Sequence, residues 1–246
     1  MIVEKMAVPD ISFIVPAHNE AQLLGQTLTA LHVAARAVEV SYEIVVADDS
    51  STDRTSAIAS AHGATVVHVA HRQIALTRNA GASVARGTLL VFVDADTIVP
   101  AETLRATLTV WRAGAIGGGA SVHLDGRLPW SARLALHPFR FGMRVARLAA
   151  GCYVFCTRQA FDAVGGFDAR LFAGEELAFS RSLWTQGRFI VLRERVVSSG
   201  RKLRTHSAWE VFTLVLSSVT RGPAVVRSRK HLDLWYGDRR HDPDAA

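Results

Sequence analysis

Hydrophobic and polar positions follow two alternating patterns along the first half of the chain. Short apolar runs of strand length are each followed by a segment whose apolar residues recur every three or four positions, as on one face of a helix. Strands are expected at residues 11–15, 42–47, 65–69 and 88–93, and helices around residues 23–31, 53–62, 75–85 and 100–112. Strands that alternate with helices over short connections predict a doubly wound, mostly parallel α/β sheet.

Polar residues beside these segments predict where the elements begin and end. Pro16 is expected to stop the first strand. The first helix is expected to take a side-chain cap from His18 or Asn19, and the second from Ser51 or Thr52. These short-range signals therefore predict compact connections between strand and helix.

The second half of the chain is less regular. Strands are expected at residues 115–124, 151–157 and 189–192, helices at 130–148, 177–186 and 207–220, and a glycine turn at 165–168. Neither an internal repeat nor a low-complexity linker interrupts the sequence. We therefore expect residues 1–246 to form a single domain.

The stretch at residues 89–96 is an apolar, β-branched run that ends in two carboxylates one residue apart. Such a run is typical of a strand buried on both faces of a parallel sheet. If strand geometry persists to its end, Asp94 and Asp96 point the same way and repel each other unless a cation lies between them. A hard divalent cation takes oxygen ligands of this kind and commonly binds phosphate as well. The alternative is that both are solvated loop residues.

Polar clusters follow three of the expected strands, at residues 16–20, 48–53 and 94–96. Ligands of open α/β sheets bind outside the carboxyl ends of the strands. Solvated aspartates placed at random would not favour the same edge, so we expect the functional site there.

The composition of the 246 residues, 49% hydrophobic and 20% charged, is that of a globular protein with a sizeable core. Residues 1–10 lack the apolar core of a signal peptide, and no apolar run is long enough to span a membrane. Cys152 and Cys156 are too few for a disulfide framework, and no second ligand pair lies near them to complete a metal site. Both are expected to be reduced thiols in a cytoplasmic protein.

The net charge of +6 is concentrated near the C-terminus, because residues 195–240 carry ten basic and three acidic residues. A basic segment suits nucleic acid, anionic lipid or a phosphorylated substrate. No aromatic-interleaved or helix-turn-helix pattern supports nucleic acid, which we do not expect as a partner. The apolar residues after 207 could form an interfacial helix at the inner membrane surface, or pack in the core.

Six motifs, taken in order, resemble those of the family 2 glycosyltransferases of GT-A fold. They are Ile-Val-Pro-Ala-His-Asn-Glu at 14–20, Val-Ala-Asp-Asp-Ser-Ser-Thr-Asp at 46–53, Thr-Arg-Asn-Ala-Gly at 77–81, Val-Asp-Ala-Asp at 93–96, Gly-Gly-Phe-Asp at 165–168 and Gly-Glu-Glu at 174–176. The match covers roughly residues 11–195. It implies a nucleotide-diphosphate sugar donor, a Rossmann-like donor half at 11–112, an acceptor half at 113–206 and a basic segment at 207–246.

The resemblance also implies which residues bind the nucleoside. Pro16, Ala17 and Glu20 match positions that line it. Asp48 or Asp49 matches the carboxylate that reads the base or the ribose.

For the diphosphate and the metal, Arg78 matches a position near the donor pocket, where its cation suits a diphosphate. Asp94 and Asp96, with Ala95 between them, match the Asp-x-Asp motif, and Asp96 is favoured as the direct ligand of Mg²⁺ or Mn²⁺. His206 is a candidate third ligand, with a structural histidine as the alternative. Arg201 and Lys202, with Arg204, are expected to close over the diphosphate or to hold a phosphorylated acceptor, and the alternative is a solvated basic loop.

The family's catalytic base is usually the aspartate of a Glu-Asp pair at a helix start, and here the pair is Glu175-Glu176. Glu176 takes the base position, and the departure from Glu-Asp leaves open which of the two acts. A capping role without chemistry is the alternative. The Gln-x-x-Arg-Trp motif of processive synthases is absent, which favours a single transfer. The resemblance implies inversion, because the family is mostly inverting.

Two alternative functions are a nucleotidyltransferase and a non-catalytic binding protein. A nucleotidyltransferase would show a glycine-rich, lysine-bearing loop after the first strand, and residues 16–20 contain neither glycine nor lysine. A non-catalytic nucleotide-sugar-binding or membrane-surface protein would not need both the Asp94/Asp96 pair and the Glu175-Glu176 pair. We therefore expect a glycosyltransferase whose acceptor is either a lipid phosphate or a small molecule.

Overall fold

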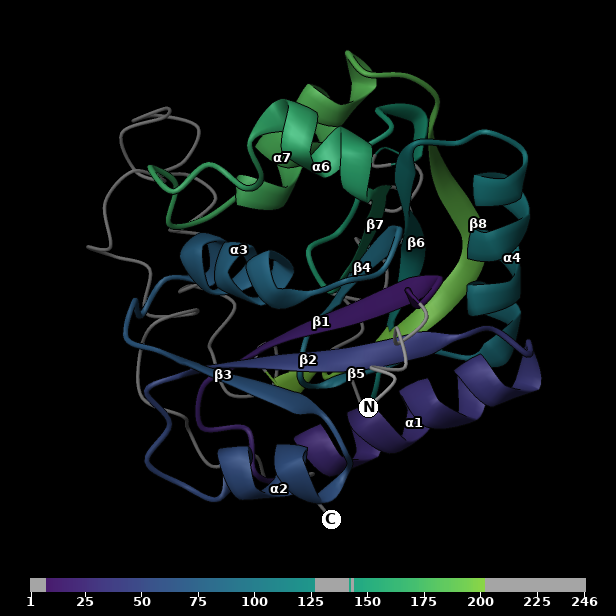
Figure 1. The fold of residues 1–246 in the computed structure, drawn as a ribbon. Helices are drawn as coiled ribbons and strands as arrows, with labels where there is room; N and C mark the ends of the chain where they lie inside the picture. The colour runs from purple at the N-terminus through teal and green to yellow at the C-terminus, as the bar shows by residue number, and fades with distance from the viewer. Residues whose placement is uncertain (1–7, 127–141, 143, 202–246) are drawn as a thin grey trace, which may run out of the picture.

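Eight strands form one sheet within residues 8–126, 142 and 144–201, which are the residues that the computed structural model describes (Figure 1). The strands are β1 (Ile11–Ala17), β2 (Tyr42–Asp49), β3 (Thr65–Val69), β4 (Leu89–Val93), β5 (Thr97–Ile98), β6 (Gly117–Leu124), β7 (Tyr153–Thr157) and β8 (Phe189–Ser198). The helices are α1 (Leu24–Ala37), α2 (Thr55–Ala61), α3 (Ile74–Val84), α4 (Ala101–Arg112), α6 (Arg158–Val164) and α7 (Glu175–Trp184).

The sheet has the order β3-β2-β1-β4-β7-β6-β8-β5. Its first four strands pair in parallel, as the alternation of strands and helices predicts. The other half is mixed, because β7 runs antiparallel to both β4 and β6 while β8 is parallel to β6. The carboxyl ends of β1, β2 and β4 therefore meet at one edge.

Two apolar layers cover the two faces of the sheet. Alternate side chains of each strand point to opposite faces, so Phe13 packs with α1, α2 and α4, whereas Ile14 packs with α3, α6 and α7. Figure 1 shows α1 and α2 on one side of the sheet and α3, α6 and α7 on the other. Helices on both faces explain why β4 is buried at all five positions.

Glycines at the start of β6 allow close approach of neighbouring backbone. A Cβ atom at Gly118 would collide with the carbonyl oxygen of Ile190, and one at Gly119 would lie 2.5 Å from Cβ of Ala149. These contacts bring the segment before β7 against the sheet, where it reaches α7.

Several local expectations were wrong. β1 continues through Pro16, which pairs with Ala47 in a parallel register. Neither α1 nor α2 has a side-chain cap, because their N-cap positions are Leu23 and Arg54 and not the expected residues. Asn19 instead accepts a hydrogen bond from the backbone N–H of Thr52. α6 follows β7 directly and is capped by Thr157, although the sequence pattern did not predict it.

The expected helix at 207–220 lies outside the described residues, as does most of the one at 130–148. Within the described part of the chain, no helix combines the length and apolar composition needed to cross a bilayer.

Candidate active site

The three polar clusters gather at the sheet edge where β1, β2 and β4 end. Ala17 pairs with Asp48 at the ends of β1 and β2, and Asp94 follows directly on β4. The N-terminus of α7, with Glu175 and Glu176 in its first turn, approaches the same edge from the other half of the chain. Acidic side chains at a helix N-terminus are stabilised by the helix dipole.

A buried arginine joins the two acidic motifs. Arg78, on α3, donates from Nη1 to Glu175 Oε1 at 2.7 Å and from Nη2 to Asp94 Oδ1 at 3.0 Å. Nη2 also donates to the carbonyl oxygen of Gly151 at 2.9 Å. The guanidinium lies over the ring of Phe167, 5.2 Å from its centroid. Arg78 therefore holds the carboxylate after β4 and the start of α7 in one arrangement.

Arg78 is only 2% exposed, and this burial by itself disfavours the charged guanidinium and lowers its pKa. The carboxylates of Asp94, Glu175 and Glu176 outweigh that effect and raise its pKa above the ordinary arginine value. The Nε atom has no hydrogen-bond partner among the described residues. The guanidinium is thus committed to protein carboxylates, and its geometry is that of a positioning residue.

Glu176, the second acidic residue of α7, differs from Glu175 in burial and in hydrogen bonding. Glu175 is 4% exposed and binds Arg78, whereas Glu176 is half-buried. Burial and the adjacent Glu175 raise the pKa of Glu176 to about 8, although Arg78 acts in the opposite direction. A carboxyl group with a raised pKa is a stronger base once ionised, as proton transfer at neutral pH requires.

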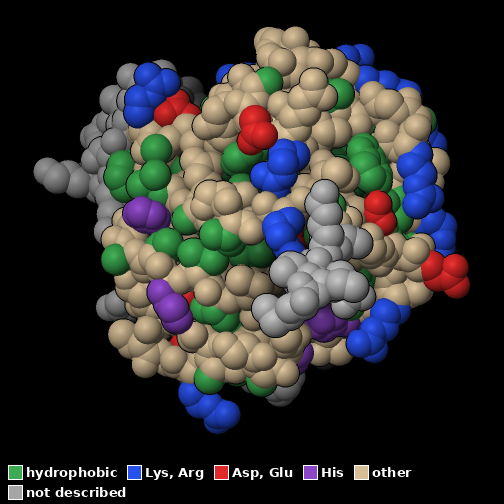
Figure 2. Space-filling view, in the orientation of Figure 1, with side chains coloured by type: hydrophobic (Ala, Val, Ile, Leu, Met, Phe, Trp, Pro, Cys, Tyr) green, Lys and Arg blue, Asp and Glu red, His purple; other side chains and the backbone are tan. Residues whose placement is uncertain are grey.

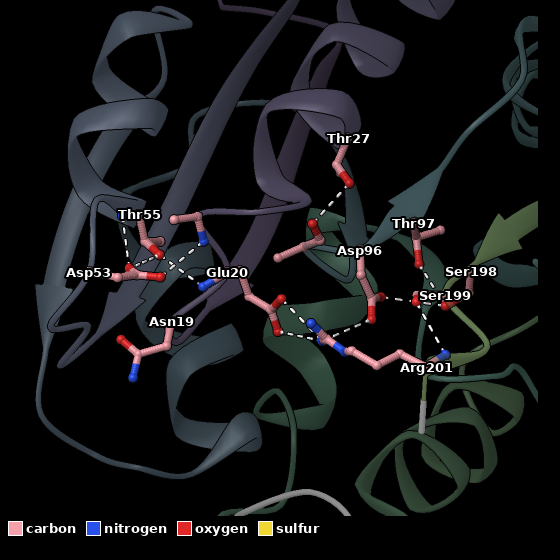
Figure 3. A network of polar contacts seen from close by, with 12 residues as sticks. Asn19, Glu20, Thr27, Asp53, Thr55, Asp96, Thr97, Ser198, Ser199 and Arg201 are labelled. Carbon is pink, nitrogen blue, oxygen red and sulfur yellow. Dashed lines mark hydrogen bonds and ion pairs between the residues drawn. The ribbon is translucent and has the colours of Figure 1, made fainter. Parts of the chain in front are cut away.

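A second arginine joins the Asp-x-Asp motif to β1. Arg201 donates from Nη2 to both carboxylate oxygens of Glu20, at 3.1 and 3.2 Å, and the same nitrogen lies 3.6 Å from Asp96 Oδ2 (Figure 3). The hydroxyl of Ser198 lies 3.5 Å from Asp96 Oδ1. Glu20, Asp96 and Arg201 are thereby brought together from three distant parts of the sequence.

Asp48 and Asp49 end β2 but have different surroundings. Asp49 accepts hydrogen bonds from the backbone N–H groups of His71, Arg72 and Gln73 and from the hydroxyl of Thr77. These bonds fix the start of α3, and with it Arg78.

Among the described residues, Asp48 accepts one backbone hydrogen bond, from Ser51, and its carboxylate lies 3.5 Å from the His68 ring. Within that part of the chain, Asp48 therefore has fewer hydrogen bonds than Asp49.

The other predicted donor-side residues lie around this edge. Pro16 is half-buried, Ala17 is buried in the apolar layer, and the carbonyl oxygen of Ala95 accepts a hydrogen bond from the hydroxyl of Thr27 (Figure 3). Lys202, Arg204 and His206 lie outside the described residues.

The oxygen donors at this edge fit Mg²⁺ or Mn²⁺. Asp94 remains 34% exposed while Arg78 binds only its Oδ1 atom, and Asp96 lies two residues away. Among the described residues, no group of three or more His, Cys, Asp or Glu side chains could hold a metal ion by itself. Mg²⁺ commonly uses one or two carboxylates, with water and substrate phosphates completing its coordination. Asp94 and Asp96 supply two carboxylates, which is the number of protein ligands that such a cation uses.

Some contributors could not be predicted from the sequence. The carbonyl of Gly151 and the ring of Phe167 both contact Arg78, and neither has a residue type that signals such a role. Phe167 lies within the Gly-Gly-Phe-Asp motif, which was the one available indication.

Comparison with known proteins gives concordant matches. The family model described as glycosyl transferase family 2 matches residues 12–163. A succinoglycan biosynthesis protein, ExoO of Rhizobium meliloti, is 28% identical over 232 residues, covering 87% of this chain and 63% of its own length. The undecaprenyl-phosphate 4-deoxy-4-formamido-L-arabinose transferase of Sodalis glossinidius is 31% identical over 111 residues, 40% of this chain and 32% of that protein.

The mannosyltransferase PcManGT from Pyrobaculum calidifontis, solved with GDP-Man and Mn²⁺, superposes with a TM-score of 0.63 at 20% identity, covering 87% of this chain and 62% of that one. At this identity the match shows a shared fold. The chain spans less than two thirds of the length of these three proteins.

Proposed function

Because this chain belongs to glycosyl transferase family 2 and has the α/β GT-A fold that its motifs predict, we propose that it transfers a sugar from a nucleotide-diphosphate sugar to an acceptor. The observation that carries the proposal is the buried contact of Arg78 with Asp94 and Glu175, which joins the Asp-x-Asp motif to the acidic pair of α7. A binding protein would have no need to hold these two acidic motifs together.

The donor binds at the carboxyl ends of β1, β2 and β4. Pro16, Ala17 and Glu20 line the nucleoside, and Asp48 reads the base or ribose, since Asp49 is engaged in holding α3. Asp96 and Asp94 would hold Mg²⁺ or Mn²⁺, with His206 as a candidate third ligand. When bound, such a cation would supply positive charge that stabilises a diphosphate leaving group.

Glu176 accepts the proton of the acceptor hydroxyl. The acceptor oxygen forms a bond to the anomeric carbon of the sugar, and the bond from that carbon to the nucleoside diphosphate breaks on the opposite side, which inverts the configuration. Glu175 is the poorer base because its carboxylate already binds Arg78 at 2.7 Å. An acceptor phosphate would be ionised already and would need no base.

The acceptor is a lipid phosphate or a small molecule, and the single domain transfers one sugar at a time. The name of the Sodalis transferase, which specifies undecaprenyl phosphate, supports the lipid phosphate. A nucleotidyltransferase is the less favoured alternative, because the segment after β1 carries neither a glycine nor a lysine.

Turnover of a donor panel tests this function. The full chain is incubated with UDP-, GDP- and dTDP-sugars, Mn²⁺ and candidate acceptors, and nucleoside diphosphate release is followed. We expect release from one donor, loss of that release on metal removal with EDTA, and recovery on re-addition of Mn²⁺ or Mg²⁺. Release that is unaffected by EDTA would contradict the metal dependence.

The pH profile of kcat/KM is expected to follow the ionisation of Glu176 when the acceptor is a hydroxyl compound. The base acts in its ionised form, and its pKa of about 8 leaves it mostly protonated at lower pH. The rate should therefore rise roughly tenfold per pH unit below a pH of about 8 and level off above it. A flat profile between about pH 6 and 8 would show that Glu176 is not the base.

A further inference from the structure

An apolar pocket of about 420 Å³ lies at the C-terminal end of α7. It is lined by Val145, Ala146, Arg147, Trp184, Gly187 and Phe189. Val145 is 67% exposed and Trp184 is 39% exposed. Other exposed large hydrophobic residues of the described chain, such as Val33 and Val84, lie singly on separate helices, whereas these two line one concave surface.

The surface around this pocket is basic. The two segments that form it, residues 144–150 and 181–189, carry four arginines and no aspartate or glutamate. These arginines are Arg144, Arg147, Arg181 and Arg188, and all four are exposed. Arg188 donates from Nη1 to the carbonyl oxygen of Ala113, at the end of α4, at 3.4 Å, which leaves Arg144, Arg147 and Arg181 as the charges assigned to the pocket. The pocket therefore combines an open apolar interior with a rim of one charge sign, which complements an anionic and apolar partner.

α7 connects the pocket to the acidic pair. Glu176, Ser180 and Trp184 recur every four residues and lie along one face of the helix. The segment before β7 runs beside this face: the indole N–H of Trp184 donates to the carbonyl of Arg147 at 2.9 Å, and the backbone N–H of Ala149 donates to the Ser180 hydroxyl at 3.2 Å. Eight residues of helix place the pocket about 12 Å along the helix axis from Glu176.

We propose that this pocket and its three arginines, Arg144, Arg147 and Arg181, form a docking surface for an anionic lipid bilayer. An indole ring with a satisfied N–H and a neighbouring aliphatic side chain suit the boundary between headgroups and acyl chains. Arginines near such a surface are attracted to the phosphates of anionic lipids. If α7 stands along the bilayer normal, docking places Glu176 about 12 Å from the docked end of the helix. This inference rests on the proposed function, in which Glu176 is the catalytic base. Because Glu176 would then lie near the bilayer, the distance favours an acceptor that is itself anchored in lipid.

Arginines elsewhere on the surface provide a control for the effect of positive charge alone on vesicle binding. Figure 2 shows Lys and Arg side chains gathered along the right-hand edge, over α4 and β8, while hydrophobic side chains form only small patches on that face. Arg36 of α1 and Arg105 of α4 are exposed and belong to helices on the other face of the sheet from α7. Neither arginine lines the pocket, so the two serve as the charge control.

Vesicle sedimentation of the full chain tests the proposal. We expect binding to vesicles of equal parts phosphatidylglycerol and phosphatidylcholine, and little binding to phosphatidylcholine alone. Val145→Asp, and separately the double variant Arg147→Glu/Arg181→Glu, should each lower the partition coefficient at least about tenfold. The matched controls Val33→Asp and Arg36→Glu/Arg105→Glu should leave it within about twofold of the wild type.

Four outcomes would overturn the proposal: no vesicle binding by the wild type, equal binding to both lipid mixtures, pocket variants that bind as the wild type does, or controls that lose as much binding as the pocket variants. Thermal unfolding and lipid-free nucleoside diphosphate release separate docking from folding and catalysis. Variants that melt and turn over as the wild type does but lose vesicle binding support the proposal. A wild type that binds vesicles but releases no nucleoside diphosphate from any donor, with either lipid-phosphate or water-soluble acceptors present, would contradict the proposed function and leave the docking surface supported.

Discussion

Glu176→Gln is expected to lower kcat for transfer to a hydroxyl acceptor by about two to four orders of magnitude, the usual contribution of a general base. Glutamine preserves the size of the side chain but cannot accept the proton of the acceptor. The nucleoside diphosphate should still bind, because its proposed contacts come from the strand ends and not from Glu176. Steady-state kinetics with the active donor, alongside titration of the nucleoside diphosphate, measures both effects.

Glu175→Gln is the matched control for this result. Glu175 lies in the same helical turn but pairs with Arg78, so its variant should lose stability and retain more activity than Glu176→Gln. If Glu175→Gln loses activity while Glu176→Gln keeps at least half of it, the two roles are exchanged and the assignment of the base is wrong.

Arg78→Met is expected to destabilise the fold by about 3–5 kcal/mol, the usual effect of removing one partner from a buried ion pair. The change leaves Glu175, which is 4% exposed, without its cation, and it releases both Asp94 and the carbonyl of Gly151. Arg78→Lys should recover only part of this loss, since one ammonium group cannot donate in the geometry of a planar guanidinium. Urea unfolding of the full chain measures the free energy of unfolding.

An exposed ion pair, between Arg170 and Asp168, provides the comparison for the buried Arg78. Arg170 forms an ion pair with Asp168 at 2.8 Å, but its side chain is 77% exposed, so Arg170→Met should leave the unfolding midpoint nearly unchanged. Equal effects of the two substitutions would show that burial of Arg78 between the acidic motifs does not stabilise the fold.

The parallel half of the fold follows from local patterns, whereas the mixed half does not. Each strand of the first half carries its own apolar run and is followed by its own helix, so sequence periodicity was sufficient. β7 lies between β4 and β6 and reverses direction there, a pairing that depends on residues far apart in the chain. α6 has only seven residues and begins at the end of β7, so its apolar period is too short to recognise.

The motifs identified the acidic groups but not how those groups are held. Arg78 was expected to face the diphosphate of the donor, yet its two amino groups bind Asp94, Glu175 and Gly151. Arg78 and Glu175 are 97 positions apart in the sequence, and no local pattern indicates that their side chains are in contact. In the same way, Asp49 matched a nucleoside-binding position, but its four hydrogen bonds to the start of α3 depend on how the loop before that helix returns to the sheet.

The most direct measurement of the central claim is the binding of the nucleoside diphosphate by the wild type and by Asp96→Asn, each titrated with and without Mn²⁺. The carboxylates that follow β4 are proposed to form a metal-dependent diphosphate site. We therefore predict that Mn²⁺ tightens binding to the wild type and that Asp96→Asn loses most of this gain while keeping its metal-independent affinity. Equal tightening in both proteins would contradict the account, because the metal would then bind the diphosphate without Asp96.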